Sequence, residues 1–151
     1  MSDTLYQLWV RGFPEGQLRV RRFSGREALS AAYSFDIEVT CPNEGDGAVE
    51  RSLLGRPAAF TMRASRTPHT VHGFIARAAL TRVAPVDHAL HLRLRLVPRL
   101  WALGRRQASR IFQRMTVPQV VDSVLRQHGI PTEWRLRHGY RSGALVGPDR
   151  H

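Results

Sequence analysis

The sequence predicts a mainly β fold, an antiparallel barrel or sandwich, followed by one amphipathic helix. Six segments within the first hundred of the 151 residues alternate apolar and polar side chains, and short turn-forming connections separate them. After Pro98 the apolar spacing changes to that of a helix. A chain of this length buries about 68–70% of its unfolded surface, so a core forms without disulfide bonds.

The first three strand segments are defined by turns and by alternation. Residues 5–11 are rich in aromatic and β-branched side chains, and residues 12–16 have the glycine and proline content of a turn. Residues 18–22 alternate apolar side chains with arginines. The clearest strand covers residues 33–40, with four apolar side chains on one face and four polar ones on the other: Tyr33, Phe35, Ile37 and Val39 against Ser34, Asp36, Glu38 and Thr40.

A loop and a short helix interrupt the strands. Residues 41–47 have loop composition, and residues 46–54 form a predicted helix that is capped by Asp46 and ended by Gly55. The strand pattern resumes over residues 57–65, with four side chains on the inner face: Ala58, Phe60, Met62 and Ala64.

The last two strand segments follow a turn at residues 67–69. They cover residues 70–80 and 89–97. In the second of them the two faces separate strictly, with Leu90, Leu92, Leu94 and Leu96 inward and His91, Arg93, Arg95 and Val97 outward. Six strands that each bury one face account for a complete core without a ligand.

A helix is predicted over residues 116–128. Thr116 and Gln119 form a capping box, Pro118 lies in the first turn and Gly129 follows the last. Its apolar residues form a single stripe: Val117, Val120, Val121, Val124 and Leu125. One further short strand is predicted at residues 133–136, and the remaining sequence is too short for a second core. The prediction is therefore a β domain over residues 1–104 and an incomplete second domain over residues 105–151.

The charge is strongly basic and spread along the chain. All 23 basic residues are arginines, and with 12 acidic residues they leave a formal net charge of +11. Many arginines alternate with apolar residues, which is typical of the solvent face of a strand. Two functional interpretations remain open, nucleic-acid binding and docking on an acidic protein surface. The aromatic residues are better explained as core than as a base-stacking platform.

No group of residues indicates catalysis, a cofactor or a metal ion. Cys41, the one cysteine, has no positioned histidine and cannot form an intramolecular disulfide. Asp36 and Glu38 share a strand face and are expected to be solvated rather than an acid–base pair. Two pairs of histidines three residues apart would point to opposite strand faces: His69 with His72, and His88 with His91. We therefore expect no catalytic, cofactor-binding or metal-ligating residues.

Seven short motifs occur in order: residues 23–30, 33–35, 53–58, 72–75, 94–103, 109–113 and 116–129. Together they resemble the N-terminal hub module of VgrG, the spike-tip protein of the type VI secretion system, which is similar to the baseplate hub of contractile phage tails. The resemblance covers the chain from about Leu5 to Trp134, and residues 98–103 with 110–113 are its most specific part.

The resemblance implies a structural role. Hub modules of this family contain two related β-barrel-like domains, form trimers and present a ring that caps the tube protein Hcp. Effectors or adaptors associate through C-terminal parts. The family has no catalytic hub residues, so the resemblance implies a protein that is not an enzyme and needs no cofactor. Positions that dock on the tube protein are expected in the loops around Arg51, Arg66 and Arg82. Nothing in the sequence selects one of these loops over the others.

The resemblance also frames the alternatives. The family pattern continues beyond this sequence, so the expected product is a truncated hub in which trimer formation is open. The alternatives are a basic nucleic-acid-binding β domain and a non-functional remnant of a spike gene. The N-terminal residues do not form a signal peptide, and no apolar run approaches the roughly 20 residues of a membrane span. We therefore expect assembly in the cytoplasm and export by the secretion machine itself.

Overall fold

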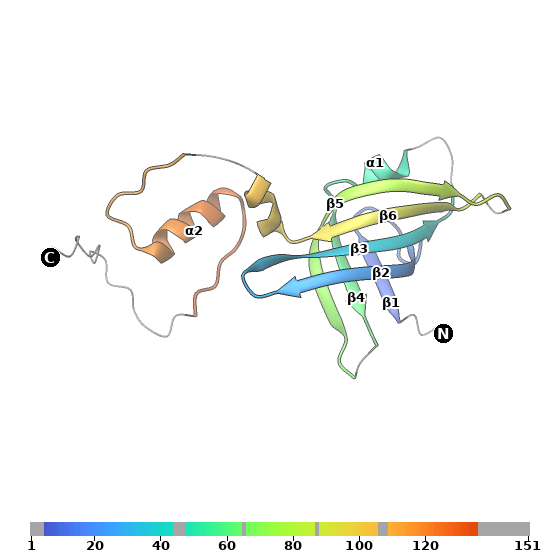
Figure 1. The fold of residues 1–151 in the computed structure, drawn as a ribbon, viewed down its shortest axis with the longest axis horizontal. Helices are drawn as coiled ribbons and strands as arrows, with labels where there is room; N and C mark the ends of the chain where they lie inside the picture. The colour runs from blue at the N-terminus through green and yellow to red at the C-terminus, as the bar shows by residue number, and fades with distance from the viewer. Residues whose placement is uncertain (1–4, 44–47, 65, 87, 106–108, 136–151) are drawn as a thin grey trace. The chain divides into compact units, whose positions relative to one another are not determined.

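The structure of the chain is a computed structural model that describes residues 5–43, 48–64, 66–86, 88–105 and 109–135. Contacts between residues divide the chain into two compact units, Met1–Leu103 and Gly104–His151. The first holds the β-sheet and the second holds the main helix (Figure 1). Their interpretation as two hub domains stays a prediction.

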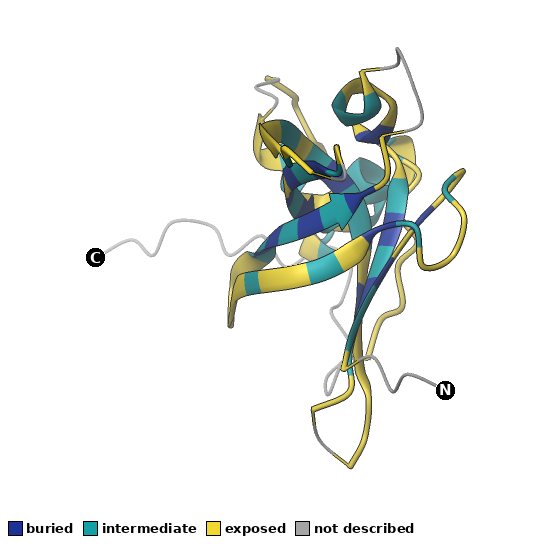
Figure 2. Ribbon diagram, turned by 90° about the vertical axis from the view of Figure 1, so that its right-hand side faces the viewer, coloured by how far each residue is buried: buried dark blue, intermediate teal, exposed yellow. Residues whose placement is uncertain are grey.

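In its described residues the first unit is built on one antiparallel sheet of six strands, which confirms the predicted fold class. The strands follow the order β1-β4-β5-β6-β3-β2 across the sheet, and each pairs antiparallel with its neighbours. The sheet curves strongly, so that its inner face encloses the core (Figures 1 and 2). The strands are β1 (Tyr6–Val10), β2 (Arg19–Ala28), β3 (Ala31–Cys41), β4 (Pro57–Met62), β5 (His69–Val83) and β6 (Leu90–Val97).

The core is formed by the predicted inner faces of the strands. Phe35, Ile37 and Val39 of β3 are buried, as are the four leucines of β6. The edge strands β1 and β2 are not hydrogen-bonded neighbours, but aromatic rings join them. The Tyr6 and Phe23 ring centroids lie 4.9 Å apart, and Phe23 packs on Phe60 at 5.0 Å. Side chains rather than backbone therefore close this side of the curved sheet.

One residue on the outward face of β6 is buried rather than exposed to solvent. Val97 is fully buried, although it lies opposite the core face of its strand. It pairs with Phe74, whose ring packs on Trp101 with centroids 6.3 Å apart. Trp101 belongs to the 3₁₀ helix η1 (Arg99–Arg105), which follows β6 after Pro98. Strand alternation alone does not reveal the contact between Trp101 and the β5 residue that pairs with Val97.

The short helix α1 (Val49–Leu53) begins later than predicted. Its N-cap is Ala48, which makes no side-chain capping bond, and the predicted cap Asp46 lies outside the described residues. Gly55 follows the helix with a φ of 72°, as its predicted role as a stop requires. Strand β4 also ends early, so that Ala64 is exposed beyond it.

In the second unit the predicted helix is confirmed as α2 (Val117–Gln127). Thr116 Oγ1 accepts a hydrogen bond from the Gln119 backbone N–H, and Gln119 Oε1 accepts one from the Thr116 N–H, so the capping box is complete. Gly129 has a φ of 63°. The predicted strand at 133–136 is wrong for residues 133–135, which have no regular structure and no partner strand among the described residues; Leu136 lies outside them.

Candidate interaction surface on the outer face of the sheet

The sheet register brings charged side chains from four strands together on the outer face. Paired residues of an antiparallel ladder point to the same side, so each cross-strand row forms a line of neighbours. Two adjacent rows follow from the pairing in the order β2-β3-β6-β5: Ser24, Asp36, Arg95 and Arg77 in the first, and Arg22, Glu38, Arg93 and Ala79 in the second.

Irregularities in β2 and β5 place two of these arginines on the outer face. The register of β2 shifts between Val20 and Arg22, and that of β5 shifts between Ile75 and Arg77. Without the extra residue, strict alternation from buried Ile75 would turn Arg77 toward the core. The two bulges therefore let each strand keep its apolar residues inside while an arginine points outward.

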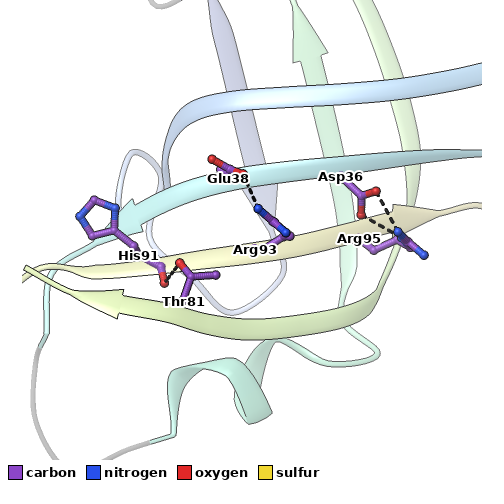
Figure 3. Close-up of polar contacts among 6 residues, drawn as sticks. All are labelled: Asp36, Glu38, Thr81, His91, Arg93 and Arg95. Carbon is purple, nitrogen blue, oxygen red and sulfur yellow. Dashed lines mark hydrogen bonds and ion pairs between the residues drawn. The ribbon is translucent and has the colours of Figure 1, made fainter.

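Cross-strand ion pairs organise the centre of the two rows (Figure 3). Arg95 donates from Nε and Nη2 to the two carboxylate oxygens of Asp36, both at 2.8 Å, and Arg93 Nη2 donates to Glu38 Oε1 at 2.8 Å. These hydrogen bonds from Arg95 are the main reason why the pKa of Asp36 is lowered. The Asp36 carboxylate fixes the plane of the Arg95 guanidinium group by bidentate pairing, whereas Glu38 holds Arg93 by a single hydrogen bond.

The rows form a groove of about 500 Å³, which we call the arginine groove. Among the described residues, neither Arg22 nor Arg77 has a carboxylate within ion-pair distance. Four arginines and two carboxylates leave the groove with a net positive charge. Eleven residues line the groove: Arg22, Phe23, Ser24, Asp36, Glu38, Arg77, Ala79, Thr81, Arg93, Leu94 and Arg95.

The three arginines expected at docking positions lie on different elements. Arg51 is in α1 and Arg66 is in the β4–β5 hairpin, at opposite ends of the first unit (Figure 1). Arg82 lies near the end of β5, with Nη2 3.4 Å from His91 Nε2, and Thr81 donates to the His91 carbonyl at 2.9 Å (Figure 3). The structure does not bring these three arginines together.

The other residues considered for chemistry are accounted for by local contacts. Cys41 is the last residue of β3 and is buried, so its predicted place in a loop is wrong. His69 Nε2 lies 3.5 Å from a Glu27 carboxylate oxygen. Within the described part of the chain no three histidine, cysteine or carboxylate side chains lie close enough to hold a metal ion. Asp36 and Glu38 lie on the outer face with side chains 37% and 41% exposed, in agreement with the predicted surface position. Their pairing with arginines depends on a strand register that the sequence pattern does not disclose.

Comparison with known proteins gives consistent matches. The family model described as phage tail baseplate hub (GPD) matches residues 26–146. The type VI secretion system spike protein VgrG4b of Pseudomonas aeruginosa is 38% identical over 143 residues, which is 93% of this chain and 17% of that protein. The actin cross-linking toxin VgrG1 of Vibrio cholerae is 30% identical over 138 residues, covering 86% of this chain and 12% of the toxin. The chain thus spans less than a fifth of the length of these relatives.

Solved structures agree with the fold. An E. coli protein, c3393, described as a component of the type VI secretion system with structural similarity to phage T4 tail proteins gp27 and gp5, matches with a TM-score of 0.68 and 30% identity. The match covers 89% of this chain and 33% of that one. A tail protein of prophage MuSo2 from Shewanella oneidensis shares the fold, with a TM-score of 0.56 and 15% identity. None of the helices in the described residues is long and apolar enough to cross a membrane.

Proposed function

The chain belongs to the phage tail baseplate hub family, and on this premise we propose that it serves as a structural part of a type VI secretion spike and not as an enzyme. The observation that carries the proposal is the family match over residues 26–146, on a chain that matches the c3393 structure with a TM-score of 0.68 over 89% of its length. Spike proteins are among its relatives, and one relative is named as a toxin.

The finer proposal concerns assembly. As the family resemblance implies, the hub would form a trimer whose ring caps the Hcp tube, with effectors or adaptors held by parts outside this sequence. Among the described residues, β1 and β2 each hydrogen-bond to a strand on one side only, and the backbone groups on their other side support pairing with a strand of another chain. In this proposal the protein is assembled in the cytoplasm and leaves the cell only through the secretion machine.

An immunoblot of the native bacterium, comparing cells with culture supernatant, tests this function. We expect the protein in the supernatant only when the secretion machine is intact. A strain with an inactivated sheath component is the matched control, and a cytoplasmic enzyme reports lysis. A protein that stays in the cells of both strains would contradict the spike role and favour a remnant of a spike gene.

Nucleic-acid binding remains the second candidate because of the net charge of +11. A basic protein binds DNA adventitiously, with affinity that falls steeply as salt rises, so affinity alone does not support this function. Preference for one sequence over a scrambled one of equal length, retained at physiological salt, would favour it over the spike role.

A further inference from the structure

We propose that the arginine groove binds an acidic segment of a partner protein, laid in extended conformation across strands β2, β3, β6 and β5. This binding goes beyond the hub function and does not depend on the trimer or on the tube. It rests on the charge, the geometry and the unused hydrogen-bond donors of the groove.

The unpaired donors lie at the two ends of the groove. Arg22 is on β2 and Arg77 is on β5, and neither has an ion-pair partner among the described residues. Three strand spacings of about 4.8 Å and one step of two residues along a strand separate their Cα atoms by roughly 16 Å. An extended peptide covers that distance in about five residues. A short acidic segment therefore reaches both arginines at once.

The two central arginines add donors without needing to move. A guanidinium group has five N–H donors. Arg95 uses two of them on Asp36, and Arg93 uses one on Glu38. Their side chains remain 42% and 60% exposed, so the remaining donors are accessible to a ligand. Because the bidentate pair with Asp36 already orders the Arg95 guanidinium group, a ligand does not have to order it, which favours affinity.

The chemistry of the groove favours carboxylates over nucleic acid. Asp36 and Glu38 lie in the middle of the groove and would repel a continuous phosphate backbone. Single-stranded nucleic acid also needs exposed aromatic rings for base stacking. The one aromatic residue along the groove is Phe23, and its ring packs inward against Tyr6 and Phe60. Separate carboxylates on a flexible peptide can reach the arginines and avoid the two acidic groups.

Binding of fluorescein-labelled hexaglutamate to the full 151-residue chain, followed by fluorescence anisotropy, tests the proposal. The salt concentration is held at about 0.1 M, where the Debye length is about 10 Å. We expect the double variant R22Q/R77Q to bind about tenfold more weakly, because it loses charge-assisted hydrogen bonds at both ends of the peptide. The matched control is R11Q/R114Q, which removes the same charge from two exposed sites outside the groove and is expected to stay within about twofold of the unaltered chain.

Three outcomes would overturn the proposal. If both double variants weaken binding equally, the peptide responds only to net charge. If the unaltered chain does not bind hexaglutamate more tightly than hexaglutamine, there is no acidic-peptide site. If labelled oligothymidylate binds more tightly than hexaglutamate and loses affinity only in R22Q/R77Q, the groove is a phosphate site instead. Circular dichroism of all variants verifies that they remain folded.

Discussion

Replacing Gly73 by alanine tests the close approach of the two central strands β5 and β6. A Cβ atom at this position would lie 2.1 Å from the Val97 carbonyl oxygen and 2.8 Å from its carbonyl carbon. A carbon atom and a carbonyl oxygen in contact stay about 3.3 Å or more apart. To reach that distance between the added Cβ atom and the Val97 oxygen, β5 and β6 would have to separate locally by about 1 Å. Backbone atoms cannot give way as the end of a flexible side chain does.

The neighbouring hydrogen bonds oppose that separation. On the other side of β5, the Ile75 N–H donates to the Arg56 carbonyl at 3.0 Å, and the Gly55 N–H donates to the Ile75 carbonyl at 2.8 Å. Moving β5 by about 1 Å breaks one or two ladder bonds worth about 1 kcal/mol each, in addition to about 1–3 kcal/mol of overpacking. We expect Gly73→Ala to lower the free energy of unfolding by about 3 kcal/mol.

Urea and thermal unfolding followed by circular dichroism measure this loss. A change of 3 kcal/mol in a unit of this size lowers Tm by roughly 12–24 °C. Gly104→Ala is the matched control, because nothing lies within 4 Å of the added Cβ and the backbone there is not in the left-handed region. We expect it to change stability by less than about 0.5 kcal/mol. A Tm for Gly73→Ala within 2–3 °C of that of the unaltered chain corresponds to a loss of only about 0.5 kcal/mol in the free energy of unfolding. That result would refute the close approach of β5 and β6.

Three further substitutions test the core, the helix and the ion pairs. Phe60→Ala removes a fully buried ring and should cost about 3–5 kcal/mol in urea unfolding; a loss below about 1 kcal/mol would contradict its central place in the core. Thr116→Ala removes one of the two hydrogen bonds of the capping box with Gln119. It should speed hydrogen exchange of the amides in the first turn of α2 by about fivefold, equivalent to about 1 kcal/mol. Unchanged exchange rates would mean that the cap does not stabilise the helix. Arg95 lowers the pKa of Asp36 in the folded protein, so the ion pair between them stabilises the protein above the unfolded pKa of Asp36 and this stabilisation is lost as pH falls through the folded pKa. Asp36→Asn should therefore flatten the decline of Tm between pH 5 and about pH 2. Parallel profiles of Tm against pH for the two proteins would exclude a stabilising role of the pair.

The arginine groove changes how the basic composition is understood. Charge that is spread evenly along the sequence becomes concentrated where four strands lie side by side, and two carboxylates fix its centre. Protein surfaces of this kind contribute more to the choice and orientation of a partner than to total affinity. That property suits a protein that assembles with others.

The sequence by itself determined the local features of this protein. Alternation in β3 and β6 placed their apolar residues in the core, because successive side chains of a strand point to opposite faces. The capping box at Thr116 and the stop at Gly129 were also readable, because a helix end depends on residues within one turn. The seven ordered motifs also indicated the family, because each motif is a run of neighbouring residues and needs no knowledge of contacts between distant segments.

Only the tertiary structure decided which strands are neighbours and in what register. The pairing of Asp36 with Arg95 joins residues 59 positions apart, and a shift of one residue would have destroyed it. The outward direction of Arg77 depends on a bulge, and the burial of Val97 on the outward face of β6 is not visible in the alternation of its strand. These features arise from contacts between distant segments, whereas sequence periodicity reports only on the segment in which it occurs.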